Sequence, residues 1–125
     1  MANVTFESVV GTTAGETITA IVRFFVNALD GGAGNDALVG AGGMLTGGIG
    51  SDTINAGAGD DTINYTVGEG ADTIDGGFNT TTGDTLTISG TIDNHSLAVI
   101  ASGGLITGVA GGSLVNVEYV NLNLM

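Results

Sequence analysis

Residues 47–64 decide the fold, and they read GGIGSDTIN followed by AGAGDDTIN. The two nine-residue units share one frame, with glycine at positions two and four, aspartate at position six and isoleucine at position eight. Glycine reaches positive φ at low cost and suits turns, whereas the polar, apolar, polar triplet Thr-Ile-Asn has the period of a half-buried strand. Each unit is therefore predicted to be a turn followed by a three-residue strand.

The same frame recurs on both sides of this stretch. Upstream, residues 31–39 (GGAGNDALV) fit it, and residues 40–46 (GAGGMLT) are two residues short and lack the aspartate. Downstream, residues 67–75 (VGEGADTID) follow a two-residue insertion, and residues 76–87 (GGFNTTTGDTLT) are three residues longer than the frame. Two units complete one coil, so unit n should stack on unit n+2 and bury a column of aliphatic side chains. The expected column is Leu38, Leu45, Ile54, Ile63, Ile74 and Leu86.

These units closely resemble the G-G-x-G-x-D-x-U-x nonapeptide of RTX (repeats-in-toxin, hemolysin-type) proteins, where U is a large aliphatic residue. The resemblance is good over residues 31–87 and poor over residues 11–19, where Glu16 stands at the aspartate position. It implies an all-β fold, a parallel β-roll that is a calcium-bound, β-helix-like solenoid. It also implies a secreted or cell-surface protein of a bacterium, exported by type I secretion.

Stacking should bring the aspartates of successive coils to the same edge, beside the carbonyls of the glycine-rich turns. Rows of carboxylates repel one another unless a cation lies between them, and ligands that are all oxygen suit calcium better than magnesium. The alternative, solvated turn aspartates, would not predict five aspartates at one position of the frame. Asp36, Asp52 and Asp72 are expected on one edge, and Asp61 and Asp84 on the other. The expected metal ligands are these five aspartates and the turn residues Gly32, Gly34, Gly48, Gly50, Gly57 and Gly59.

We expect two to four calcium ions, because the short unit at residues 40–46 has no carboxylate and the insertion before Asp84 departs from the frame. A binding site that is absent from the unfolded chain converts binding energy into folding energy. The chain is therefore expected to be loose at cytosolic calcium and to fold in millimolar calcium outside the cell.

Composition limits the possible partners. The 125 residues carry a formal charge of −12 with a single basic residue, Arg23, so nucleic acid and anionic membranes are improbable partners. The most apolar stretch, residues 18–29, is shorter than the roughly 20 residues that span a bilayer. Absence of cysteine excludes disulfides and thiolate metal sites, and no cleavable signal peptide is visible at residues 1–7.

We predict three segments: an N-terminal degenerate turn and cap (1–30), the calcium-binding β-roll (31–87) and a C-terminal β-strand cap (88–125). Residues 20–30 interrupt the frame and are expected to form a short helix or strand that caps the coil. After the repeats, strands are expected at residues 86–89, 96–100, 105–109 and 113–124, arranged as an antiparallel cap. Gly103-Gly104 is typical of a hairpin.

The residues discriminate between catalysis, ice binding and a structural role. Catalysis is not expected, because the sequence has one histidine, His95, no cysteine and no H-E-x-x-H motif. Ice binding is a weaker alternative, because in-frame threonines such as Thr53 and Thr62 face outward while the variable turn positions are irregular. The favoured interpretation is a calcium-binding structural module that pairs with further copies of itself in a surface layer or filament. The alternative is a passive folding or secretion module of a larger toxin, adhesin or extracellular enzyme.

Overall fold

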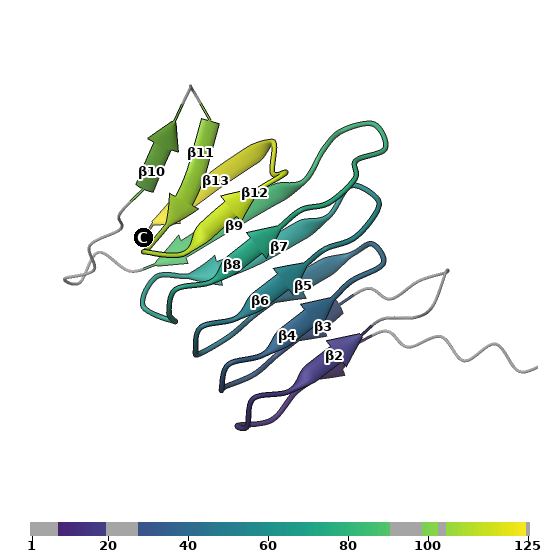
Figure 1. The fold of residues 1–125 in the computed structure, drawn as a ribbon, viewed down its shortest axis with the longest axis vertical. Coiled ribbons are helices and arrows are strands. Elements are labelled where there is room, and N and C mark those ends of the chain that lie inside the picture. The colour runs from purple at the N-terminus through teal and green to yellow at the C-terminus, as the bar shows by residue number, and fades with distance from the viewer. Residues whose placement is uncertain (1–7, 20–27, 91–98, 103–104, 125) are drawn as a thin grey trace, which may run out of the picture.

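The computed structural model describes residues 8–19, 28–90, 99–102 and 105–124 (Figure 1). Within these ranges every regular element is a β-strand, and none of them forms a helix that could cross a membrane. The strands are β1 (Val9–Val10), β2 (Thr17–Thr19), β3 (Ala28–Asp30), β4 (Ala37–Val39), β5 (Met44–Thr46), β6 (Thr53–Asn55), β7 (Thr62–Thr66), β8 (Thr73–Asp75), β9 (Thr85–Gly90), β10 (Val99–Ser102), β11 (Leu105–Val109), β12 (Ser113–Val115) and β13 (Tyr119–Leu124).

Two parallel sheets form the body of the molecule, as the tiers of Figure 1 show. One has the order β1-β3-β5-β7-β9-β13 and the other β12-β8-β6-β4-β2. From β1 to β9, each strand therefore pairs with the strand two positions away in the chain, for example Ile54 opposite Ile74 in β6 and β8. The predicted stacking of unit n on unit n+2, and with it the parallel β-roll, is confirmed.

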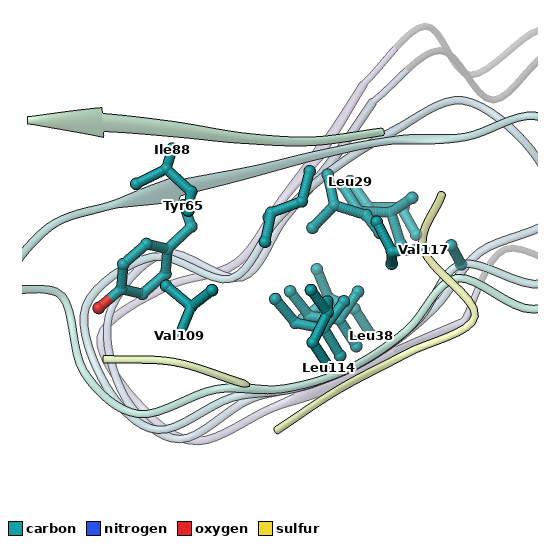
Figure 2. Packing of buried hydrophobic residues seen from close by; sticks show 13 residues of the cluster. Leu29, Leu38, Tyr65, Ile88, Val109, Leu114 and Val117 are labelled. Atoms are coloured by element: carbon teal, nitrogen blue, oxygen red, sulfur yellow. The ribbon is translucent and has the colours of Figure 1, made fainter. Parts of the chain in front are cut away.

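The core consists of two facing columns of aliphatic side chains, one from each sheet. Every three-residue strand from β3 to β8 buries its central residue. Successive side chains of a strand point to opposite faces, so the two flanking residues point outward. Figure 2 shows Leu38 and Leu114 in one column and Leu29 in the other. All six aliphatic residues of the predicted column are buried, but they are divided between the two sheets. Burying such a side chain stabilises the fold by about 1.5–3 kcal/mol, so the core grows with each added coil.

The coil widens where the frame is interrupted after Asn64. The two inserted residues, Tyr65 and Thr66, continue β7 and pair with Ile88 and Ser89 of β9. Tyr65 is buried and its hydroxyl donates a hydrogen bond of 2.7 Å to the carbonyl of Gly70. Figure 2 shows Tyr65, Ile88 and Val109 together beside the main columns. The insertion thus adds a second small cluster to the core of the last coils.

The predicted antiparallel C-terminal cap holds for β10 and β11 only, which pair antiparallel on either side of residues 103–104. It is wrong for residues 113–124, because β12 pairs parallel with β8 and β13 pairs parallel with β9. The reason is burial: Leu114 and Val120 stand at the aliphatic positions and extend the two columns. The coil therefore resumes after the hairpin, which stands beside β12 in Figure 1.

At the other end, β1 pairs with β3 and β2 pairs with β4, so the degenerate unit 11–19 stacks on the first regular repeat. Of the expected cap at residues 20–30, only β3 lies among the described residues, and it is a strand of the larger sheet. Residues 20–27, Arg23 among them, and His95 lie outside the described part of the chain.

Candidate metal sites at the coil edges

Acidic residues form two rows, one along each edge of the coil. The first, here called the even row, precedes strands of the five-stranded sheet, and the second, the odd row, precedes strands of the six-stranded sheet. The even row is Glu16, Asp36, Asp52 and Asp72, and the odd row is Asp61, Asp84 and Glu118. The structure thus places the five predicted aspartates on the two expected edges.

One oxygen of each acid except Glu16 is held by a main-chain N–H of the preceding coil. In the even row, the Asp36 N–H donates to Asp52 Oδ1 at 2.8 Å and the Asp52 N–H donates to Asp72 Oδ1 at 3.0 Å. In the odd row, the Asp61 N–H donates to Asp84 Oδ1 at 2.7 Å. These bonds fix the carboxylates in register and explain why neighbouring acids tolerate such close stacking.

The other oxygen is buried without a partner at four of the five aspartates. Oδ2 of Asp36, Asp52, Asp61 and Asp84 makes no hydrogen bond with any described residue, and each of these aspartates is 2% exposed or less. A buried carboxylate oxygen without a hydrogen bond or a counter-charge is strongly unfavourable. The arrangement is therefore complete only when a cation lies against these oxygens.

Burial also changes the acidity of the rows. It raises the pKa of Asp61 to about 6, and the nearby charges of Asp84 and Asp60 act in the same direction, against the hydrogen bond from the Gly43 N–H. The pKa of Asp72 is likewise raised to about 6, mainly by burial and further by the charge of Asp52. The fold thus resists ionisation of the carboxylates that it buries, and a bound cation would reverse this effect.

The turns bring main-chain carbonyls to the same edges. All six predicted turn glycines have positive φ, as the frame requires: Gly32, Gly34, Gly48, Gly50, Gly57 and Gly59. Adjacent turns approach so closely at Gly50 that a Cβ there would overlap the carbonyl oxygen of Gly34. At Gly31, a Cβ would lie 2.7 Å from Asp36 Oδ2 and would also contact the Gly47 carbonyl oxygen of the next coil. An unpartnered carboxylate oxygen and a carbonyl oxygen therefore border the same small space.

Side chains alone do not complete a metal site in the described ranges, where no three Asp, Glu, His or Cys groups gather around one point. Any ion would need main-chain carbonyls as additional ligands. A set of carboxylate and carbonyl oxygens with flexible geometry fits calcium, which takes six to eight oxygen ligands. The residues present therefore fit the ion that the sequence resemblance implies.

Glu118 and Asp60 make contacts that the repeat frame does not predict. Glu118 Oε2 accepts the Asp84 N–H at 2.8 Å and so ends the odd row. The signal was available in residues 118–121 (EYVN), an acid followed by the polar, apolar, polar triplet, but no glycine-rich turn precedes it.

Asp60 lies in the turn between β6 and β7 and contacts the loop between β8 and β9, which contains the three-residue insertion. Its carboxylate accepts N–H groups from Thr80 at 2.9 Å and Thr82 at 3.0 Å, and further ones from Thr81 and Gly83. These hydrogen bonds hold the pKa of Asp60 well below its usual range. Asp60 thus holds the inserted residues outside the coil, which lets Asp84 keep its place in the row.

Comparison with protein families gives one match. The model described as the RTX calcium-binding nonapeptide repeat matches in four copies, over residues 27–43, 44–68 and 66–80. Searches of curated proteins and of solved structures gave no match. The matched ranges contain Asp36, Asp52, Asp61 and Asp72 and end before Asp84 and Glu118.

Proposed function

Because the chain carries RTX calcium-binding nonapeptide repeats in a parallel β-roll, we propose that it is a calcium-binding structural module of a secreted or cell-surface bacterial protein. The observation that carries this proposal is the set of buried, unpartnered Oδ2 atoms at the coil edges. Bound calcium supplies the positive charge that these oxygens lack, and the module folds when it binds.

The ligands follow from the positions of the acids and the turns. Oδ2 of Asp36, Asp52, Asp61 and Asp84 and the carboxylate of Asp72 supply charge, and carbonyls of the neighbouring turns complete the coordination. The proposed turn residues are Gly32, Gly34, Gly48, Gly50, Gly57 and Gly59. Two to four ions would change the formal charge of −12 to between about −8 and −4.

Folding on calcium binding follows from the same contacts. Each row joins three or more coils, so the acids of a row come together only when the coils stack. Extracellular modules bind calcium with dissociation constants of about 10⁻⁴–10⁻³ M, well above cytosolic calcium. The chain is then loose inside the cell, which suits passage through a type I secretion channel, and folds outside, where ligand binding stabilises the native state.

Circular dichroism of the chain in excess chelator and in millimolar calcium tests this proposal. We expect a large gain of β signal and of melting temperature in calcium, and little gain in the same concentration of magnesium, whose smaller ion demands octahedral geometry. Equal spectra and equal melting temperatures in chelator and in calcium would refute it.

Within this function, we propose that copies of the module associate edge to edge in a surface layer or filament. The support is β13, the edge strand of the larger sheet, which is six residues long and uncharged. Its side chains Leu122 and Leu124 are 57% and 50% exposed. A long, uncharged edge strand is a template for pairing.

The alternative is a passive folding or secretion module of a larger toxin, adhesin or extracellular enzyme. Size-exclusion chromatography and electron microscopy with and without calcium separate the two. Assemblies that form in calcium and disappear in Leu122→Lys would support self-association. A chain that is monomeric both with and without calcium would refute self-association and favour the passive module.

A further inference from the structure

The last turn of the coil, residues 116–118, reproduces the oxygen arrangement of a regular repeat. At the regular turn of Asp36, the space beside Gly31 is bordered by Asp36 Oδ2 and by the Gly47 carbonyl of the next coil. Beside Gly76, the corresponding space is bordered by Asp84 Oδ2 and by the carbonyl oxygen of Asn116. Asn116 thus presents its carbonyl where a regular repeat presents that of its first glycine.

The acid of this turn also has the contact of a row member. Glu118 Oε2 accepts the Asp84 N–H at 2.8 Å, just as Asp84 Oδ1 accepts the Asp61 N–H at 2.7 Å. The N–H groups of Glu118 and Tyr119 donate to the Asp84 carbonyl at 3.1 and 3.0 Å. Both the N–H and the carbonyl of Asp84 therefore hydrogen-bond to the last turn.

A glutamate suits this position because the turn is short. Only Asn116 and Val117 separate the end of β12 from Glu118, whereas the residues from Gly76 to Gly83 separate β8 from Asp84. Val117 is buried in the core, which draws the turn inward. The extra methylene of glutamate lets the carboxylate reach the edge from this tighter path.

We propose that Asp84, Glu118 and the main-chain carbonyl of Asn116 form a terminal calcium site between the last repeat and the C-terminal segment. The Asp84 side chain is 0% exposed, and its Oδ2 has no hydrogen-bond partner among the described residues, so this oxygen requires a ligand. This inference rests on the calcium binding proposed above and extends it beyond residue 80, where the match to the repeat family ends. Calcium at this site fastens β13 to β9, so it stabilises the C-terminal end of the coil.

Calcium stoichiometry tests the terminal site. Glu118→Gln keeps an oxygen that can accept the Asp84 N–H but removes the charge, and Glu69→Gln is the matched control because Glu69 Oε2 accepts an N–H from Thr66 in an exposed turn. By equilibrium dialysis of the full chain, we expect Glu118→Gln to bind one ion fewer than the unaltered protein and Glu69→Gln to bind the same number.

The outcomes separate this inference from the proposed function. An unaltered chain that binds no calcium overturns both, whereas an unaltered chain and Glu118→Gln that bind the same number of ions, with the same affinity, overturn only the terminal site.

Terbium luminescence locates the site by a second route. The sequence has two tyrosines and no tryptophan, so in Tyr65→Phe only Tyr119, whose N–H donates to the Asp84 carbonyl, can sensitise a bound terbium ion. We expect tyrosine-sensitised emission in Tyr65→Phe, displaced by calcium, and its loss when Glu118→Gln is added. If adding Glu118→Gln to Tyr65→Phe leaves the emission unchanged, the terbium ion binds elsewhere and the terminal site is refuted.

Discussion

Asp61→Asn should affect the calcium-free and the calcium-bound protein in opposite directions. The side chain is buried, and its Oδ2 has no hydrogen-bond partner in the part of the chain that the structure describes. Its Oδ1 accepts the Gly43 N–H at 2.7 Å, a bond that the asparagine oxygen can keep. The substitution therefore removes a buried charge with little change of shape. In chelator the variant should be more folded than the unaltered chain, whereas in calcium it should bind more weakly because a charged ligand is lost.

The size of the effect follows from the acidity of the group. Burial raises the pKa of Asp61 from 3.8 to about 6, and each pKa unit corresponds to about 1.4 kcal/mol. Ionisation of Asp61 therefore lowers the free energy of unfolding by at most about 3 kcal/mol. Because water at the coil edge screens the charge, we expect Asp61→Asn to raise the free energy of unfolding in chelator by about 1–3 kcal/mol. Because the folded pKa is the higher one, this stability is complete below the unfolded value of 3.8 and is lost as the pH rises through about 6.

Circular dichroism in excess chelator between pH 7.5 and pH 5 measures this change. We expect the β signal of the unaltered chain to grow as the pH falls through about 6, because protonation of Asp61 and Asp72 replaces part of the effect of calcium. Asp61→Asn should have a larger β signal at pH 7.5 and a smaller increase toward pH 5. Asp30→Asn, which lies outside both rows, should show the same increase as the unaltered chain. A β signal that stays constant or falls toward pH 5 in the unaltered chain would show that buried charge does not oppose folding.

Three further substitutions test the loop, the core and the turns in calcium. Asp60→Ala removes the carboxylate that accepts N–H groups from residues 80–83, so the melting temperature should fall and protease should cut this loop faster than in Asp60→Asn. Leu86→Ala truncates a side chain that is 0% exposed and should cost about 2–5 kcal/mol in urea unfolding. Gly50→Ala should raise the calcium needed for folding more than Gly59→Ala, because the nearest atom to a Cβ on Gly59 is 3.8 Å away whereas a Cβ on Gly50 would overlap a neighbouring carbonyl. Equal effects of the two glycine substitutions would contradict the close approach of the turns.

The regular coils could be predicted because their frame specifies both parts of the unit. The triplets around Ile54 and Ile63 alternate in polarity, and in the structure both side chains are buried between outward neighbours. The turn glycines require positive φ, which few other residues adopt at low cost. Turn, strand and buried position were therefore all visible in nine residues, and so was the division of the aspartates between two edges.

The irregular coils could not be predicted, because hydrophobic alternation does not distinguish parallel from antiparallel strands. Residues 113–124 alternate like a hairpin, but Leu114 and Val120 stack on the columns of the two parallel sheets. The hairpin of β10 and β11 stands between the last repeat and this segment, which hides the continuity of the coil in the sequence. Likewise, the effect of the insertion before Asp84 depends on the contacts of Asp60, which lies more than 20 residues away.

Glutamate replaces aspartate at one end of each row, at Glu16 in the even row and Glu118 in the odd row, and the hydrogen bonds explain why. Each acid in a row accepts an N–H from the coil before it, but among the described residues no coil precedes Glu16 in its sheet. Its longer side chain instead turns back and accepts the Thr12 N–H of its own turn at 2.9 Å, whereas Glu118 uses its length to reach Asp84 from a short turn. An in-frame change from aspartate to glutamate therefore marks the place where the geometry of the stack changes. In this chain the acid followed by a polar, apolar, polar triplet identifies β2 and β13, where the glycine pattern fails. It does not identify β1, β3 or β12, which follow Ser8, Asn27 and Gly112.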